Sequence, residues 1–154
     1  MSKIYVMCGL IGSGKSTEAR RLVMENKNIV AINRDHMRIM FNAGTYDFNP
    51  NTEPLNLELQ NLAMLMCLDK GFNVVLDACF LKVENRAKVF EVMPIHAQIV
   101  CVYCTESVNN LANRMTDPRG YTEEYWSGVL ESMREAFEPP TLDEPFEDII
   151  IHAI

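Results

Sequence analysis

The sequence predicts an α/β domain of three layers, in which a five-stranded parallel sheet is flanked by helices. Short apolar segments alternate along the chain with segments of helical periodicity, which is the pattern of successive strand–helix–strand units. The chain has 154 residues, 48% of them hydrophobic and 23% charged, which suits one globular domain. We therefore expect residues 1–154 to form a single domain.

Five apolar segments are the predicted strands. They are Lys3–Cys8, Ile29–Ile32, Asn73–Ala78, Ala97–Cys104 and Asp148–His152. The first leads directly into a glycine-rich loop, so the N-terminal segment is expected to be a strand and not a signal peptide. No apolar run approaches the roughly 20 residues that a membrane helix needs. We expect a cytoplasmic protein with no membrane partner.

Six segments are the predicted helices. They are Lys15–Glu25, Arg34–Phe41, Thr52–Lys70, Val83–Val92, Glu106–Met115 and Thr122–Phe137. Gly71 follows the third as a stop signal, and Pro139-Pro140 ends the last. Met64 and Met66 are expected to pack in the core. Residues 42–54 form the longest predicted loop, a candidate lip of the site.

The net charge of −7 is unevenly distributed along the chain. Residues 1–119 carry thirteen Lys and Arg against twelve acids, whereas residues 120–154 carry one Arg against nine acids. A strongly basic footprint for nucleic acid is therefore absent. A short nucleic-acid contact on the N-terminal part remains compatible with this distribution.

The cysteine pattern indicates buried thiols. Five cysteines are an odd number, and no export signal accompanies them, so a disulfide framework is not expected. Cys101 and Cys104 are spaced like half of a zinc site, but positions i and i+3 of a strand point to opposite faces. No second pair completes four ligands, so no structural zinc is expected.

The segment Gly9–Thr17 fits the pattern G-x-x-x-x-G-K-[ST] between a predicted strand and a predicted helix. Its glycines let backbone N–H groups point at an anion, and the dipole of the following helix adds positive potential. Lys15 is expected to reach the β- and γ-phosphates, and Ser16 to place its hydroxyl on Mg²⁺. The predicted nucleotide-binding residues are Gly9, Gly12, Ser13, Gly14, Lys15, Ser16, Thr17 and Arg114. The expected partner is a nucleoside triphosphate, with ATP and Mg²⁺ as cofactors.

The other contents of the chain favour a kinase-type P-loop NTPase. A GTPase would usually carry an N-K-x-D element that reads the base, and the sequence has none. A motor ATPase would need a larger body and a sensor-bearing second domain. We therefore expect phosphoryl transfer to a small acceptor, or to the end of a longer acceptor that threads into the site.

Asp35 and Arg38 follow the second predicted strand and are the candidate acceptor-side residues. A carboxylate at that edge of the sheet can take the proton of an attacking hydroxyl. Arg38 lies three residues on, on the same helical face, and its planar fork suits a phosphate on the acceptor. The competing interpretation makes Asp35 a helix cap and leaves Arg34 and Arg38 as solvated charges.

Two further elements complete the predicted site. The third strand runs into Asp77, a carboxylate that is expected to support the metal or the attacking group, and a structural bracing role is the alternative. Arg114 and Arg119 bracket a Pro/Gly turn, which predicts a small lid at about residues 114–122. Arg119 is the candidate that stabilises the transferring phosphoryl group, because Arg114 is also explained by the dipole at a helix end.

Together these elements resemble the P-loop polynucleotide 5′-kinases, the family of the phage T4-type kinase domain and its single-domain bacterial and phage relatives. The resemblance rests on Gly9–Thr17, on the N-R-D-x-x-R stretch from Asn33 to Arg38, on Val75-Leu76-Asp77, and on Arg114 with Arg119-Gly120. It implies that Asp35 is the general base, that Arg38 binds the acceptor phosphate, that Asp77 supports the site and that Arg119 stabilises the transferring group. It also implies a setting in phage or bacterial nucleic-acid repair.

Three hypotheses about function follow. The leading one is ATP-dependent transfer to the 5′-hydroxyl of a nucleic acid, catalysed by Lys15, Asp35 and Arg119. The first alternative is a kinase of a small-molecule or modified-base hydroxyl, such as that of a nucleoside, a sugar or an antibiotic. The second is an ATP-binding module without phosphoryl transfer.

Overall fold

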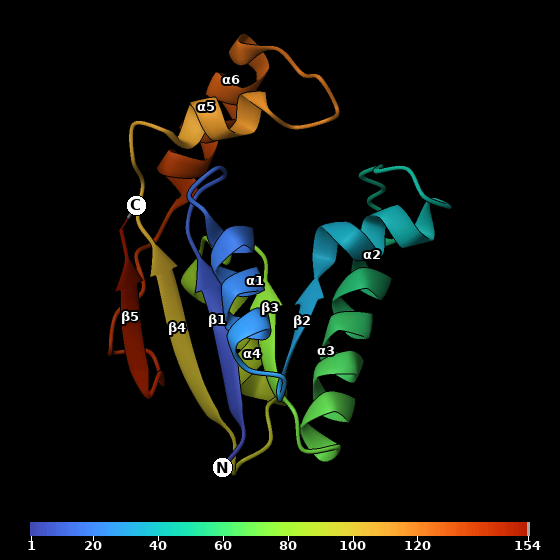
Figure 1. Cartoon of the computed structure of the whole chain (residues 1–154), viewed down its shortest axis with the longest axis vertical. Helices are drawn as coiled ribbons and strands as arrows, with labels where there is room; N and C mark the ends of the chain where they lie inside the picture. The colour runs from blue at the N-terminus through green and yellow to red at the C-terminus, as the bar shows by residue number, and fades with distance from the viewer. Residues whose placement is uncertain (154) are drawn as a thin grey trace.

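The computed structural model of the chain describes residues 1–153 and contains one parallel five-stranded sheet (Figure 1). The strands are β1 (Lys3–Cys8), β2 (Ile29–Asn33), β3 (Asn73–Asp77), β4 (Gln98–Cys104) and β5 (Asp148–His152). Their order across the sheet is β2-β3-β1-β4-β5, and every neighbouring pair is parallel. All five carboxyl ends therefore meet at one edge, with β1 in the centre.

Helices cover both faces of the sheet and form the outer layers. Helix α1 (Lys15–Glu25) covers one face, where Ala19 packs against Met7 and Val75. Helices α3 (Glu53–Asp69) and α4 (Val83–Val92) cover the other, through residues such as Met64 and Val89. The remaining helices, α2 (Arg34–Phe41), α5 (Asn110–Met115) and α6 (Glu123–Ala136), lie at the carboxyl edge (Figure 1).

The predicted fold class and all eleven predicted elements are confirmed, most of them within one residue at each end. The fifth helix is the main correction, because it begins at Asn110 and not at Glu106. The Asn110 side chain accepts a hydrogen bond from the Ser107 backbone N–H at 2.8 Å, and this turn delays the helix. The prediction for Met66 was also wrong, because its side chain is 66% exposed while Met64 is buried. Residues two apart on a helix point to nearly opposite sides.

The cysteine side chains lie where the strand pattern predicts. Cys101 packs in the core beneath α3 and α4, and Cys104 packs in the core beneath α1. Within residues 1–153 no group of three His, Cys, Asp or Glu side chains is placed to hold a metal ion by itself. In the same range no helix is both long and apolar enough to cross a membrane.

A buried ion pair joins the C-terminal segment to the core of the fold. The Arg86 guanidinium, on α4, donates to both carboxylate oxygens of Glu144 at 2.7 and 3.0 Å. It also donates to the Phe80 carbonyl at 2.8 Å, and the Arg86 side chain has no exposed surface. Paired and hydrogen-bonded in this way, the charge is tolerated inside the protein.

Candidate functional site

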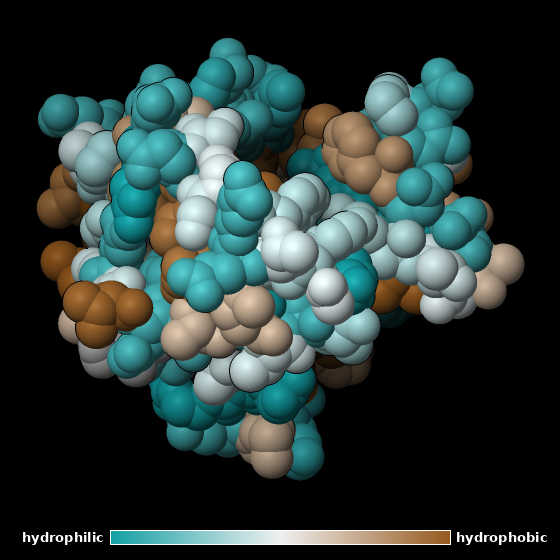
Figure 2. Space-filling view, turned by 90° about the horizontal axis from the view of Figure 1, so that it is seen from above, coloured by the Kyte–Doolittle hydropathy of each residue, from teal (hydrophilic) through white to brown (hydrophobic). Residues whose placement is uncertain are grey.

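A cleft of about 1140 Å³ opens at the carboxyl edge of the sheet, between the phosphate loop, α2 and the segment 113–133. The predicted site residues that line it are Gly12, Gly14, Lys15, Ser16, Thr17, Asp35, Arg38, Asp77, Arg114 and Arg119. Gly9 and Ser13 belong to the same loop and lie just beneath this surface. Hydrophilic and intermediate residues cover most of this edge (Figure 2). Predicted residues from four separate parts of the sequence thus converge on one cleft.

The phosphate loop is packed closely against its neighbours. A Cβ atom at Gly12 would lie 2.1 Å from the Asn110 carbonyl oxygen, and one at Gly9 would lie 2.5 Å from that of Cys104. Gly12 also has a φ of +69°, which L side chains rarely adopt. Only glycine fits these two positions, so the loop conformation is imposed by contacts as well as by sequence.

Two asparagines of α5 hold the loop from the side of β4. The Asn110 side-chain amide donates to the Ile11 carbonyl at 2.9 Å, and that of Asn113 donates to the Gly12 carbonyl at 2.8 Å. These two bonds are accepted by carbonyl groups of the loop. The N–H groups of the loop therefore remain available to bind an anion. The sequence analysis missed both residues. Their i, i+3 spacing after the fourth strand is the only signal that could have indicated them.

The loop also presents groups that a nucleotide and a metal could use. The Lys15 ammonium donates to the Leu10 carbonyl at 2.6 Å, and the buried Ser13 hydroxyl has no hydrogen-bond partner among residues 1–153. The Ser16 side chain is exposed in the same cleft as the carboxylates of Asp35 and Asp77. Hydroxyl and carboxylate oxygens are ligands that Mg²⁺ prefers, usually together with phosphate oxygens. The residues present therefore fit a Mg²⁺–nucleotide complex.

Asn33 connects the ends of β2 and β3 and was not predicted as a site residue. Its side-chain oxygen accepts from the His36 N–H at 3.0 Å and caps α2. Its amide donates to the Asp77 carboxylate at 2.8 Å, and Asn33 and Asp77 are paired in the sheet register. Since Asn33 is the cap, the alternative that made Asp35 the helix cap is wrong. The Asp35 side chain does not cap the helix and lines the cleft instead.

Asp35, Arg38 and Glu53 form a chain of charges on the acceptor side. The Arg38 guanidinium donates to Asp35 at 2.7 Å and to the two oxygens of Glu53 at 2.9 and 2.5 Å. The bond with Glu53 raises the pKa of Arg38, and the bond with Arg38 holds the pKa of Glu53 below its usual value. The interpretation of Arg38 as a solvated charge is therefore wrong. Glu53 begins α3, and nothing in its sequence context indicated this contact.

The lid arginines share one carboxylate. Arg119 donates to both oxygens of Asp117 at 2.8 and 2.9 Å, and Arg114 donates to one of them at 2.7 Å. These partners, Arg119 foremost, lower the pKa of Asp117 to about 2. The sequence analysis named both arginines but missed the aspartate between them. Asp117 holds the two guanidinium groups side by side at the rim of the cleft.

Aromatic rings surround the Arg119 guanidinium. Its central carbon lies 4.3 Å from the ring centre of Tyr46, 5.2 Å from that of Trp126 and 5.7 Å from that of Tyr121. These distances are typical of cation–π contacts. Tyr46 belongs to the loop between α2 and α3, on the acceptor side. The lid and this loop therefore touch across the cleft. Burial of the Tyr46 side chain, together with the negative charge of Asp35, raises the pKa of Tyr46.

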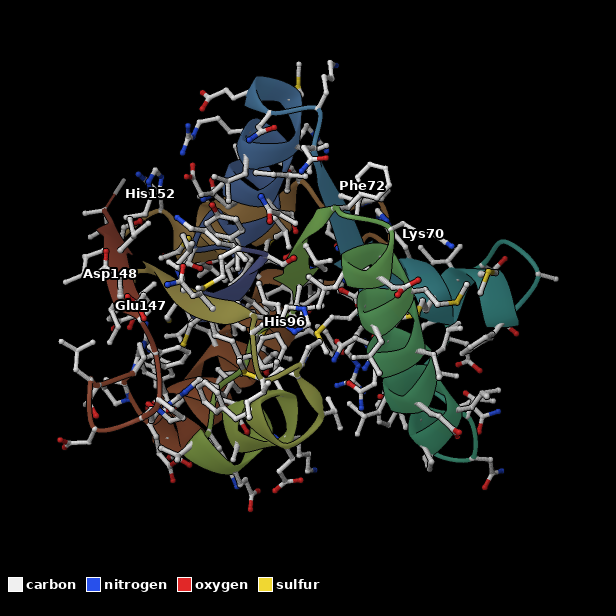
Figure 3. The ribbon with its side chains drawn as sticks, turned by 90° about the horizontal axis from the view of Figure 1, so that it is seen from below. Lys70, Phe72, His96, Glu147, Asp148 and His152 are labelled. Carbon is white, nitrogen blue, oxygen red and sulfur yellow. The ribbon has the colours of Figure 1, made fainter. Side chains whose placement is uncertain are left out.

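The histidines are dispersed. His36 and His96 are exposed, and His96 lies near the centre of the view in Figure 3, which looks at the opposite edge of the sheet. His152, at the end of β5, lines the cleft instead, and its Nδ1 is 3.8 Å from the buried Glu18 carboxylate of α1. The sequence analysis did not name His152 as a site residue, so its place in the cleft is a finding of the structure.

Comparison with known protein families gives one match, to the family AAA_33, described as an AAA domain, over residues 4–140. No curated protein matches the chain. The AAA name contrasts with the expectation that excluded a motor ATPase, but two of the three solved structures described next are kinases.

Three solved structures illustrate the likeness. A chain of the Pnkp1/Rnl/Hen1 complex is 26% identical with a TM-score of 0.66; the match covers 76% of this chain and 40% of that one. A sugar kinase from Janibacter sp. HTCC2649 is 20% identical with a TM-score of 0.68 and coverages of 99% and 85%. A fungal RNA kinase is 16% identical with a TM-score of 0.69 and coverages of 97% and 74%. The present chain thus spans less than half the length of the first of these proteins.

The match over most of the chain, the central phosphate loop and the parallel sheet agree with one another. The chain belongs to the AAA_33 family, and its fold is the P-loop fold of solved sugar and RNA kinases.

Proposed function

We propose that the chain transfers the γ-phosphate of ATP to the 5′-hydroxyl of a nucleic acid. The observation that carries the proposal is the Asp35–Arg38 pair, joined at 2.7 Å, in the same cleft as Lys15 and Ser16. A carboxylate that can take a proton and a guanidinium that can bind a phosphate thus stand side by side. A nucleic-acid end offers both partners, because its reacting hydroxyl is followed by a phosphodiester.

The residues divide the reaction between them. Asp35 accepts the proton of the 5′-hydroxyl as its oxygen forms a bond to the γ-phosphorus. The bond from that phosphorus to the bridging oxygen of ADP breaks, and ADP leaves. Lys15 and Arg119 bind the charge that develops on the phosphates, while Arg38 orients the acceptor. Ser16 and Asp77 would hold Mg²⁺, which neutralises phosphate charge when it is bound.

The acceptor assay uses γ-labelled ATP, Mg²⁺ and three acceptors: a 5′-hydroxyl oligonucleotide, a set of nucleosides and a set of sugars. We expect label on the oligonucleotide. In Asp35→Asn, transfer should fall by about 10²-fold or more, while ATP binding is retained. Transfer that survives this substitution would show that Asp35 is not the base. A chain that binds ATP but labels no acceptor would be an ATP-binding module.

One observation favours a second candidate, a kinase of a small uncharged hydroxyl. Asp35 and Glu53 pair with Arg38, and Glu53 also pairs with Arg34, so neither guanidinium of the described acceptor side is unpaired. Arg38→Ala separates the two candidates. For a nucleic-acid acceptor it should raise the KM of the oligonucleotide and spare the KM of ATP. For an uncharged acceptor, the KM of the acceptor should change little.

A further inference from the structure

A second groove, of about 530 Å³, adjoins the cleft on the acceptor side. Arg34, Phe48 and Asn85 line both hollows, so the groove is continuous with the space in which the acceptor hydroxyl would react. Its volume lies in the range of pockets that hold one small ligand. The groove therefore offers an exit from the cleft on the side of Asp35, away from the phosphate loop.

Phe48 stands at the junction of the two hollows. Its side chain is 57% exposed, and its ring centre lies 5.8 Å from the guanidinium carbon of Arg38. Pro50, Pro54 and Leu57 continue the apolar wall into the groove. An exposed aromatic ring beside an apolar wall is a surface on which a flat, unpaired base can stack.

Positive charge flanks this apolar wall. Arg34, at the cleft end, is fixed by a hydrogen bond of 2.7 Å from its Nε to Asn56. Lys88, at the other end, has no carboxylate within ion-pair distance among residues 1–153. Glu53, the acid that lines the groove, is shared by Arg34 at 3.4 Å and Arg38 at 2.5 Å, so Lys88 is the lining cation without a carboxylate partner among residues 1–153. The unpaired charge left in the groove is therefore positive, which suits a phosphate.

We propose that this groove binds the second nucleotide of a single-stranded acceptor. The base of that nucleotide stacks on Phe48, and the phosphate that follows it lies near Lys88. The first nucleotide occupies the main cleft, with its 5′-hydroxyl at Asp35 and its 3′-phosphate at Arg38. This inference rests on the proposed function and names its substrate more closely: a single strand of at least two nucleotides, because a paired base could not stack in the groove.

The test compares acceptors of increasing length. A nucleoside 3′-phosphate, a dinucleotide and a trinucleotide, each with a free 5′-hydroxyl, are titrated against the complete chain at saturating ATP. We expect the acceptor KM to fall about tenfold from the 3′-phosphate to the dinucleotide, because one stacking contact is gained. A KM that is the same for both acceptors would overturn the inference.

Variants of the groove give a second readout. In Phe48→Ala and Phe48→Leu, the ratio of the two KM values should approach one, whereas Phe48→Tyr should restore it, because the ring is retained. Lys88→Ala should reduce by about one the slope of log KM against log salt for the trinucleotide. Lys27→Ala, an exposed lysine between α1 and β2 at the opposite edge, is the matched control and should change neither quantity.

The outcomes also separate this inference from the proposed function. If the acceptors are labelled with a length-dependent KM that Phe48→Ala leaves intact, the groove is not the subsite and the 5′-kinase proposal stands. If no nucleic-acid acceptor is labelled while a sugar or nucleoside is, both proposals fail.

Discussion

The two sides of the cleft are built in different ways. On the donor side, the phosphate loop is fixed by backbone contacts and by two asparagines, and it leaves the Ser13 hydroxyl without a partner. On the acceptor side, the charges satisfy one another: Asn33 binds Asp77, and Arg38 binds Asp35 and Glu53. The donor side is thus shaped for an anion that it does not itself supply. On the acceptor side each charged group already has a partner of opposite charge or a hydrogen-bond partner. A substrate that binds there must therefore compete with these side-chain partners.

The sharpest test of the donor side is Lys15→Ala. Within residues 1–153 the hydrogen-bond partner of the Lys15 ammonium is the Leu10 carbonyl, so we expect the fold to survive the loss of this group. Transfer should fall by about 10³-fold, because a preorganised cation aimed at the transferring phosphate is removed. Single-turnover rates with γ-labelled ATP, together with a thermal melt, measure both quantities. A loss below tenfold would assign the phosphate charge to another residue.

A glycine pair tests whether contacts or backbone conformation fix the phosphate loop. Gly12→Ala should reduce the free energy of unfolding by about 3 kcal/mol, because the added carbon meets the Asn110 carbonyl at a positive φ. Gly120→Ala is the matched control: its φ is +71°, but no atom lies within 4 Å of the new carbon. It should cost only about 1 kcal/mol. Equal losses in urea unfolding would show that the contact with α5 does not matter.

Glu53→Gln tests the balanced acceptor side. The amide keeps the size of the carboxylate but removes the charge that holds Arg38. We expect kcat/KM for the acceptor to fall about tenfold with the KM of ATP unchanged, because Arg38 in turn positions Asp35. Glu58→Gln, an exposed position on the same helix, should behave as the unmodified chain. A similar rise in the KM of ATP would instead indicate that Glu53 has a general structural role.

The lid gives the smallest expected effect, and it depends on pH. The pKa of Asp117 is about 2 in the folded chain, below its ordinary value of 3.8. The folded state therefore gains stability that is present above pH 4 and is lost as the pH falls towards 2. Asp117→Asn should lower the free energy of unfolding by about 1 kcal/mol at pH 7, since solvent screens part of the pairing. In urea titrations this difference should shrink below pH 4, and a difference that is constant with pH would contradict the assignment.

The fold was predictable from the sequence because local patterns determine it. Alternating apolar and helical segments gave every element, and the glycine-rich loop located the donor side. Asp35, Asp77 and Arg119 were predictable for the same reason, since each follows a strand or a helix at the expected edge. Their roles stay predictions. Glu53 and Asn33 were not predictable, because a carboxylate or amide that binds a distant arginine or strand end carries no local signal. Asp117 lies between its two arginines in the sequence, but the turn that brings all three side chains together is visible only in the structure. Asn110 and Asn113 were missed because their spacing is only a weak signal and their partners in the phosphate loop are about 100 residues away.

The Arg86–Glu144 pair has a consequence for the synthesis of the protein. Arg86 enters the core when α4 packs, but its counter-charge is made 58 residues later. A growing chain that has not reached Glu144 holds a cation that must stay solvated, since an unpaired buried charge is strongly destabilising. We therefore expect the packing of α4 on the sheet to be completed late in synthesis, after Glu144 has been made. We expect a chain that ends before Glu144 to be less stable than the complete chain, because Arg86 then has no counter-charge.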